Sequence, residues 1–153
     1  MDENRTRKLV QALDTPTSAD MDAAWEPIRA IGAPLIPFLA EFLPKAKNWL
    51  CRASLLTYLG PYSRESDVAF AAGLAALNDK SKAVRYSACE LCAYSLRKEA
   101  IPPLQVLLGH SDPLTSSAAA AAIDAITHRN HHYFRDRDHS GVVRWDYVSP
   151  GLT

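Results

Sequence analysis

Apolar residues recur along most of the chain at the spacing of a helix, not of a strand. The spacing i, i+4, i+7 and i+11, which places residues on one helix face, is shown by Val84, Ala88, Leu91 and Ser95. Good helix formers, mainly Ala, Leu, Glu, Lys and Arg, dominate between residues 9 and 125, and two-residue alternation is almost absent there. The pattern therefore predicts an all-α fold.

Short breaks divide this helical pattern into pairs. Thr17-x-x-Asp20 has the form of a capping box, and Asp112 stands before a proline where a helix should begin. Gly32 and Gly60 stand where helices should end. We therefore predict four helical hairpins, which pair 3–13 with 18–31, 34–44 with 47–59, 66–77 with 81–96, and 99–108 with 113–128.

The predicted hairpins repeat one another in sequence. Four positions stay apolar in three successive copies, offset by 35 and then 30 residues: Leu39, Phe42, Trp49 and Ala53; Leu74, Leu77, Val84 and Ala88; Leu104, Leu107, Leu114 and Ala118. Repeats of this length are typical of stacked hairpins, in which each pair of helices is covered by its neighbours. We expect the small alanines of this set to let the helices approach closely.

The third hairpin carries a recognisable motif. Residues 74–79 read LAALND and residues 84–88 read VRYSA, and together they resemble the HEAT repeat. In that family a first helix of the type IPxLxxLL leads through an Asp-containing turn to a second helix that opens Val-Arg-x-x-Ala. By analogy with the family, we expect Asp79 and Arg85 to tie one turn to its neighbour.

The resemblance covers roughly residues 20–128, although Leu50 and Thr115 replace the motif arginine in the second and fourth hairpins. It implies a right-handed α-solenoid of about four stacked hairpins, of HEAT or armadillo type, with a short C-terminal hairpin or loop as a cap. We expect residues 1–129 to form the repeat array and residues 130–153 to form a tail packed on the last repeat.

Composition and charge fit one globular unit. Of the 153 residues 48% are hydrophobic and 22% charged, and 17 Lys and Arg balance 17 Asp and Glu. The zero net charge argues against a nucleic-acid partner, because such binding depends on clustered positive charge. No secretory signal opens the sequence, and its longest uncharged stretch, residues 100–111, is too short to span a bilayer. We expect a cytoplasmic protein with no membrane partner.

The three cysteines are an odd number, which fits a reducing compartment better than a disulfide framework. Cys89-x-x-Cys92 has the spacing of half a zinc site or of a redox pair, but zinc would need two further ligands. Both cysteines fall in the middle of a predicted helix beside the buried stripe. We interpret them as small core residues and expect no cofactor.

The segment after residue 130 departs from the helical pattern. Residues 136–141 read DRDHSG, which matches the first six positions of a calcium loop, but position 12 is Tyr147 where a glutamate is normal. We favour a turn at residues 139–141 over a calcium site. We expect three apolar residues to cover the exposed end of the last repeat: Phe134, Val143 and Trp145.

Four of the five histidines lie in or beside this segment: His128, His131, His132 and His139. Their spacing alone allows a metal site. Positive charge at a helix C-terminus and a left-handed stop at Asn130 explain the same residues without a metal. We favour this second interpretation and predict no metal, although residues 130–134 hold more polar and aromatic groups than a cap requires.

A candidate partner-binding surface follows the second helix of the third hairpin, where Tyr86, Glu90, Tyr94 and Arg97 recur beside the buried stripe. Tyr and Arg commonly anchor protein interfaces. An equally open alternative is that the tyrosine rings pack between repeats. Since second helices line the concave face in HEAT-like arrays, we extend the predicted surface to Arg52 and Tyr58, and the tail adds His131, His132 and Tyr133.

These features favour a non-enzymatic protein-binding module that grips one protein partner with its concave face and its tail. The sequence holds no G-x-S-x-G, no glycine-rich phosphate loop and no H-E-x-x-H, so we predict no catalytic residues. A HEAT-like chain of this length resembles a small stand-alone bacterial adaptor or an immunity protein. Within this class we favour an immunity protein that binds a toxin domain and occludes it.

Two other classes remain as alternatives. One is a nucleic-acid-acting enzyme that resembles the HEAT-like DNA glycosylases, for which the residue types are supplied by Trp25, Trp49, Arg52 and Arg85. The other is a metal-dependent function of the tail through its histidines with Asp136 and Asp138.

Overall fold

The computed structural model describes residues 2–147, which fold into helices joined by short connections and contain no strand. Within these residues the α-helices are α1 (Glu3–Gln11), α2 (Ser18–Trp25), α3 (Ile36–Phe42), α4 (Trp49–Leu59), α5 (Asp67–Ala76), α6 (Lys82–Ser95), α7 (Ile101–Leu107) and α8 (Pro113–Thr127). A short 3-10 helix, η6 (His131–Phe134), follows α8. The all-α prediction is confirmed.

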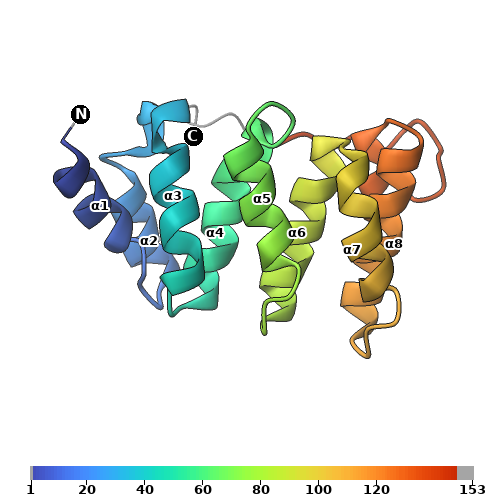
Figure 1. Cartoon of the computed structure of the whole chain (residues 1–153), viewed down its shortest axis with the longest axis horizontal. Coiled ribbons are helices and arrows are strands. Elements are labelled where there is room, and N and C mark those ends of the chain that lie inside the picture. Colours follow the sequence, from blue (N-terminus) through green and yellow to red (C-terminus); the bar gives the residue numbers. More distant parts are fainter. Residues whose placement is uncertain (1, 148–153) are drawn as a thin grey trace.

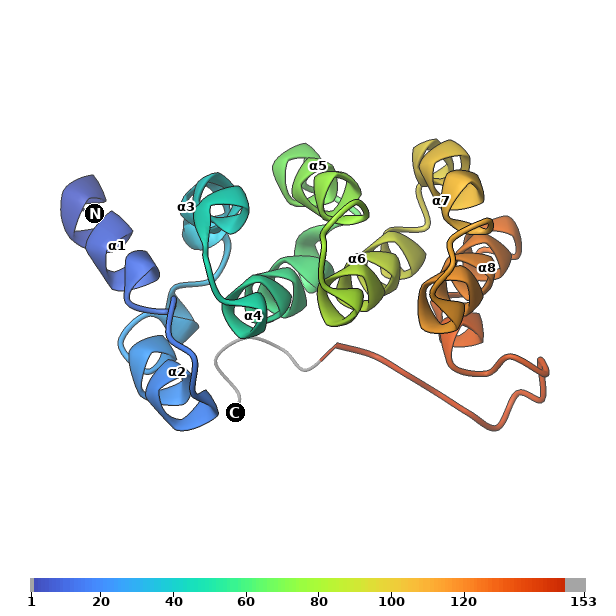
Figure 2. The ribbon, with the colours of Figure 1, turned by 90° about the horizontal axis from the view of Figure 1, so that it is seen from below.

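The helices form two layers of a solenoid (Figure 1). The first helices of the hairpins, α1, α3, α5 and α7, lie in one layer, and the second helices, α2, α4, α6 and α8, lie in the other (Figure 2). Contacts join α4 to α6 and α6 to α8 in the second layer, and α1 to α3 and α3 to α5 in the first. The stack of helical hairpins predicted from the repeat is therefore confirmed.

Capping residues begin the helices where the sequence predicts. Thr17 Oγ1 accepts a hydrogen bond of 3.3 Å from the backbone N–H of Asp20, and its own hydroxyl donates to the Asp20 carboxylate at 2.7 Å. At the start of α8, Asp112 Oδ2 accepts from the backbone N–H of Thr115 at 3.1 Å. These bonds satisfy N–H groups that have no partner inside the first helical turn.

The end of α8 differs from the prediction. Arg129, with φ 52°, takes the left-handed conformation that we expected at Asn130. Asn130 is extended, with φ −139°, and its side chain accepts a hydrogen bond from the backbone N–H of His132. It therefore starts η6 instead of ending α8.

The core lies between the two layers and is built from aliphatic residues and alanines. Ala88 and Ala118 are fully buried, as their place in the repeat predicts. Val84 is fully buried too, but Trp49 and Leu114 at the equivalent positions are exposed. These two are the first and second residues of their helices, whereas Val84 is the third residue of α6 and lies deeper in the stack.

The cysteines are part of this core. Cys51, Cys89 and Cys92 are all buried and unpaired. Burial raises the pKa of the Cys89 thiol to about 12, so the thiolate that a redox or metal site needs is disfavoured. Their interpretation as small core residues agrees with this placement.

Two buried arginines each tie one hairpin to the turn of the next. Arg52 donates to the carboxylate of Asp79 through Nε at 2.8 Å and Nη2 at 3.1 Å. Arg85 donates through Nε to Thr115 Oγ1 at 2.8 Å and forms an ion pair with Asp112 at 3.4 Å. Arg85 donates to Asp79 only at its backbone carbonyl, at 2.9 Å, so the two motif residues Asp79 and Arg85 form no ion pair with each other. Each of the two ion pairs instead joins adjacent hairpins.

Candidate protein-binding face

The chain after α8, residues 131–147, is called the tail below. It begins with η6, which packs against α8 and α6. From residue 142 the chain is extended and runs back beneath the second-helix layer from α8 toward α4 (Figure 2). The remainder of the predicted tail, residues 148–153, lies outside the described residues. The first part of the tail packs on α8 of the last repeat, through η6 and through Arg137 and His139, and the part that follows reaches the face of α6.

Two aromatic residues attach the tail to α6 and α4. The rings of Trp145 and Tyr147 contact the ring of Tyr94 edge to face, with centroid distances of 6.1 and 5.2 Å. Tyr147 also lies directly on the backbone at Gly60, where a Cβ atom would stand 2.2 Å from the tyrosine Cζ. Gly60 has a helical φ of −52°, so it does not adopt the helix-ending conformation that we expected of a glycine at this position.

The predicted stripe on α6 faces the tail. The ring of Tyr86 contacts that of Phe134 with a centroid distance of 5.4 Å. Glu90 forms an ion pair of 2.5 Å with Arg135. Burial raises the pKa of Glu90, and the hydrogen bond and charge of Arg135 oppose this effect. Tyr86, Glu90 and Tyr94 are therefore brought together, but beneath the protein's own tail.

His131 fixes the tail beside Tyr94. Its ring contacts the tyrosine edge to face at 4.9 Å, and its Nε2 lies 2.6 Å from a carboxylate oxygen of Asp146. The guanidinium of Arg64 lies over the Tyr94 ring at 4.2 Å and bonds His131 Nδ1 at 2.8 Å. Burial lowers the pKa of His131, which favours the neutral ring in this cluster, whereas the Asp146 hydrogen bond acts in the opposite direction.

The other two predicted tail residues lie on either side of this cluster. His132 Nδ1 accepts a hydrogen bond of 2.9 Å from the backbone N–H of Trp145, so His132 holds the extended segment in place. Tyr133 points away from this cluster, and its ring stacks on that of His139 with a centroid distance of 3.8 Å.

Arg52 and Tyr58 do not lie on an open surface. Arg52 is only 6% exposed because its guanidinium is held by the ion pair with Asp79. Tyr58 stacks on Trp25 with a centroid distance of 4.9 Å, and its hydroxyl donates to the carbonyl of Arg29 at 2.8 Å. Both side chains face an adjacent repeat and are buried, so the structure does not place them on the surface where we expected them.

Arg97 also turns away from the rest of the stripe. It forms an ion pair of 2.7 Å with Asp67 and donates from Nη2 to the backbone carbonyl of Arg64 at 3.0 Å. Its guanidinium lies over the ring of Phe70 at 4.8 Å. Arg97 follows the end of α6, so the helical spacing that places it beside Tyr94 no longer applies.

The residues proposed for a glycosylase-like site do not converge. Arg52 and Arg85 are buried in their ion pairs, and Trp25 is buried with its indole N–H donating to Ser54 at 2.7 Å. Trp49 is 52% exposed and stands at the start of α4. A basic surface with these four side chains around one base is therefore not formed.

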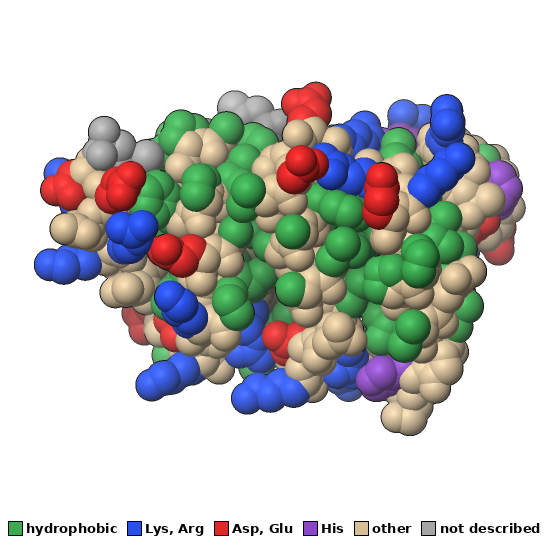
Figure 3. Space-filling view, viewed as in Figure 1, with side chains coloured by type: hydrophobic (Ala, Val, Ile, Leu, Met, Phe, Trp, Pro, Cys, Tyr) green, Lys and Arg blue, Asp and Glu red, His purple; other side chains and the backbone are tan. Residues whose placement is uncertain are grey.

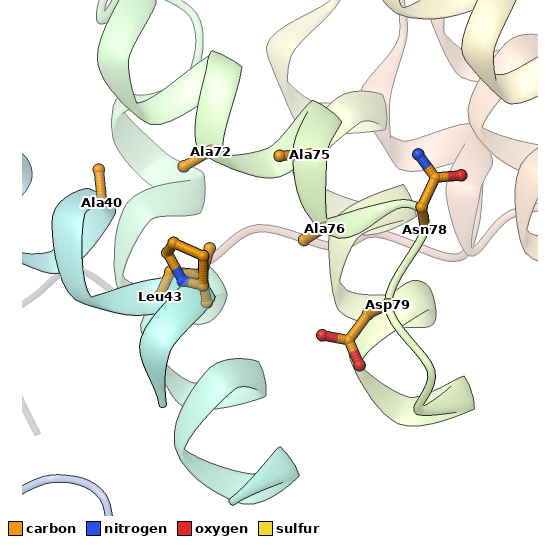
Figure 4. A pocket seen from close by; sticks show the side chains of 8 residues that line it. Ala40, Leu43, Ala72, Ala75, Ala76, Asn78 and Asp79 are labelled. Carbon is orange, nitrogen blue, oxygen red and sulfur yellow. The ribbon is translucent and has the colours of Figure 1, made fainter. Parts of the chain in front are cut away.

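The opposite, first-helix layer has exposed apolar side chains over α7, including Val106 and Leu108 (Figure 3). A cavity of about 310 Å³ lies between α3 and α5, and Figure 4 shows its lining of four alanines together with Leu43, Asn78 and Asp79. The Asp79 carboxylate is already held by Arg52, so the cavity offers few polar groups that could orient a ligand.

Several residues of this face were not predicted as partner-binding: Gly60, Arg64, Arg135, Trp145 and Tyr147. We expected Trp145 to cover the exposed end of the last repeat, but it contacts Tyr94 of the third hairpin. The signal in the sequence is the alternation Trp145-x-Tyr147, which presents two aromatic rings on one side of an extended chain.

Comparison with known proteins agrees with the helical stack. Residues 70–130, from α5 to just beyond α8, match a family model described as HEAT repeats. The chain is a HEAT-like helical-repeat protein. HEAT repeats are commonly protein-interaction modules and are typically non-enzymatic, which fits a binding role for this HEAT-like protein. No curated protein matches the chain. Among the described residues, no helix has both the length and the apolar character needed to cross a membrane.

Proposed function

We propose that this HEAT-like protein is a non-enzymatic protein-binding module, and that one protein partner binds the outer side of the tail where it crosses the second helices. The observation that carries the proposal is the fixed, extended course of the tail. Trp145 and Tyr147 turn inward onto α6, while Arg144 and Asp146, which alternate with them along the chain, are exposed. A segment already held in its binding conformation loses less conformational entropy when a partner binds.

The outer side of the tail offers both apolar and charged groups. Val142 is 80% exposed and Val143 46% exposed, next to the charges of Arg144 and Asp146. Within the described residues, the backbone N–H groups of Val143, Arg144 and Asp146 donate no hydrogen bond. An extended segment with free backbone groups can pair with a strand of another protein, and its side chains then supply specificity.

A toxin domain is the partner that we favour, with the present protein as its immunity protein. The stacked hairpins form a long face, and a face of this size is enough to cover one small domain. Occlusion of the active site or substrate path of such a domain needs no catalytic residue in the inhibitor. This fits a HEAT-like protein whose second-helix face carries aromatic and charged contacts to its own tail.

The test is affinity capture from the organism that encodes the protein, with a variant of the tail and a matched control. Val142→Ser with Arg144→Glu changes one exposed valine and one exposed cation on the tail. Val106→Ser with Lys98→Glu makes the same two kinds of change away from the tail; Val106 is 77% exposed on α7.

We expect one stoichiometric protein to bind the wild type and the control pair but not the tail pair. Expression of that protein alone should arrest growth, and co-expression of the wild type should restore growth. Capture that is lost only in the control pair would place the partner on the first-helix layer. Capture of nucleic acid with no protein would overturn the proposal.

A further inference from the structure

A second histidine cluster lies at the end of α8, apart from the aromatic contacts of the tail on α6. Asp124 lies in the last turn of α8, His128 is the residue that caps the C-terminus of this helix, and His139 comes from the loop after η6. His139 Nε2 lies 2.5 Å from Asp124 Oδ2, and His128 Nδ1 lies 3.0 Å from Asp124 Oδ1. One possible ligand atom from each residue lies within 4.8 Å of the other two.

The loop is built so that His139 reaches Asp124. Asp136 is almost fully buried and accepts hydrogen bonds from the backbone N–H and hydroxyl of Ser140, at 3.0 and 2.7 Å, and from the N–H of Gly141 at 2.8 Å. This turn leaves His139 in a left-handed conformation, with φ 54°. Such a conformation is uncommon for a residue with a side chain, and it clusters at functional sites.

Tyr133 supports both imidazole rings. Its ring stacks on His139 with an interplanar angle of 9° and meets His128 edge to face with a centroid distance of 5.7 Å. The side chains of His128 and His139 are 50% and 35% exposed, so a small rotation of either ring can change the distance between their nitrogen atoms. Ligand atoms around a tetrahedral zinc ion stand roughly 3–4 Å apart, given metal–ligand bonds of about 2 Å.

The charge around Asp124 distinguishes this cluster from the one formed by His131, His132 and Asp146. Among the described residues only histidines pair with Asp124; no Lys or Arg does. In the other cluster Arg64 bonds His131 and Arg144 bonds His132, at 2.8 and 3.2 Å. A cation there would meet two guanidinium groups.

In the cluster of His131, His132 and Asp146, both nitrogens of each imidazole are also already used. His131 bonds Arg64 and Asp146 through its two nitrogens, and His132 bonds Arg144 and accepts from the N–H of Trp145. Metal binding would break the contacts that fix the tail. This cluster is therefore a structural one and serves as an internal control.

We propose that Asp124, His128 and His139 bind one divalent transition-metal ion of the zinc type. Two imidazoles and one carboxylate are ligands that zinc prefers, and three protein ligands leave a fourth position for water or for a side chain of another molecule. The ion replaces the imidazole proton between His139 and the Asp124 carboxylate, and the proton on His128 Nδ1, which now faces both that carboxylate and, at 2.9 Å, the backbone carbonyl of Asp124. It also ties the loop of residues 135–141 to the end of α8. The assignment does not depend on the proposed partner.

The test is calorimetric titration of the untagged, metal-free full-length protein with zinc chloride, together with NMR of the histidine side chains. We expect one equivalent of zinc to bind, with shifts confined to His128, His139 and their neighbours. His139→Asn removes the imidazole, while asparagine tolerates the left-handed turn. This variant should lower the affinity for zinc by at least about 100-fold. The loss is then larger than the 10–100-fold that is typical when a residue only orients a metal-ligating side chain.

His132→Gln in the other cluster is the matched control and should bind zinc as the wild type does. Far-UV circular dichroism of each variant checks that the array is folded. Absence of zinc binding at millimolar zinc in the wild type would overturn the proposal. Binding that survives both His139→Asn and Asp124→Asn, or that disappears in His132→Gln, would overturn it as well.

Discussion

The ring of Tyr147 fills the space that any side chain at Gly60 would need. A Cβ atom at Gly60 would stand 2.2 Å from Tyr147 Cζ and 2.5 Å from Cε2, closer than non-bonded atoms approach. Gly60 has a helical backbone, so its conformation does not require glycine. The requirement comes instead from the tail, which lies more than 80 residues later in the sequence.

Gly60→Ala should therefore release the tail without unfolding the array. Alanine in a helical conformation is favoured over glycine by about 0.5–1 kcal/mol, so the helices themselves should be no less stable. The added methyl group would displace Tyr147 and expose the chain around Arg144. We expect faster tryptic cleavage after Arg144, followed by mass spectrometry, at an unchanged helix content.

Gly109→Ala is the matched control for this experiment. A Cβ atom at Gly109 would meet only the carbonyl oxygen of Val106, at 3.9 Å, which is an ordinary contact. Cleavage after Arg144 should stay at the wild-type rate in this variant. Equal rates in Gly60→Ala and wild type would show that the tail does not depend on this contact.

Most of the fold could be predicted from the sequence because its determinants are local or repeated. Helix faces follow from residues three and four apart, and Thr17 and Asp112 mark helix starts through bonds to residues three positions later. The repeat then predicts which hairpins are neighbours. Ala88 and Ala118 are buried where the repeat places them.

The candidate face could be predicted only in part, because its contacts join distant segments. Helical spacing places Tyr86, Glu90 and Tyr94 together, but no local pattern shows that Trp145 and Tyr147 return to cover them. The ion pair of Arg52 with Asp79 spans 27 residues and depends on the stacking of two hairpins. From the sequence alone, Arg52 is predicted to be a surface residue that anchors a partner. In the fold it is a buried residue whose ion pair connects two hairpins.

Asp79→Ala should destabilise the array strongly. The side chain of Arg52 is 7% exposed, so removal of its carboxylate partner leaves a buried charge that, among the described residues, is held only by the backbone carbonyls of Ala46 and Lys47. Loss of one member of a buried pair costs about 3–5 kcal/mol. The free energy of unfolding in urea should fall by an amount in this range.

Asp67→Ala is the comparison for that measurement, because Asp67 pairs with Arg97 but is 94% exposed. Exposed ion pairs contribute about 0–1 kcal/mol, so this variant should stay close to the wild type. A similar loss of unfolding free energy in both variants would mean that the buried Arg52–Asp79 ion pair stabilises the array no more than an exposed ion pair does.

Acid should weaken the ties between hairpins. Burial alone would raise the pKa of Asp79, but hydrogen bonds from Arg52 and Ser81 outweigh it and lower that pKa below its usual value. A carboxylate with a lowered folded-state pKa adds stability above its unfolded pKa of about 3.9, and this stability disappears as the pH falls through the folded value. Asp79→Asn should therefore show a shallower loss of unfolding free energy below about pH 4 than the wild type.

Ala88→Leu tests the register of the stack. Ala88 is fully buried on α6, so the larger side chain overfills a packed junction and should cost about 1–3 kcal/mol. Ala120→Leu makes the same change at an exposed position of α8 and should leave the thermal midpoint near the wild-type value. If the two variants had the same midpoint, the predicted junction would be wrong.

Tyr147→Phe should hold the tail more tightly than the wild type does. The Tyr147 hydroxyl is buried and has no hydrogen-bond partner among the described residues. A buried polar group without a partner costs about 1–3 kcal/mol, and phenylalanine keeps the ring contacts with Tyr94 and Gly60 while it removes that group. Tryptic cleavage after Arg144 should then slow by about five-fold or more, because cleavage follows the population of the released tail.

Tyr133→Phe is the matched control, because the Tyr133 hydroxyl is not among the buried polar groups that lack a hydrogen-bond partner. This variant should leave the rate of cleavage after Arg144 unchanged. Faster cleavage in Tyr147→Phe would contradict the expectation, since it would mean that the hydroxyl contributes a favourable contact. Unchanged cleavage would mean that the ring alone sets the attachment of the tail. Slower cleavage would identify the hydroxyl as a group whose desolvation weakens the docking of an otherwise well-packed aromatic side chain.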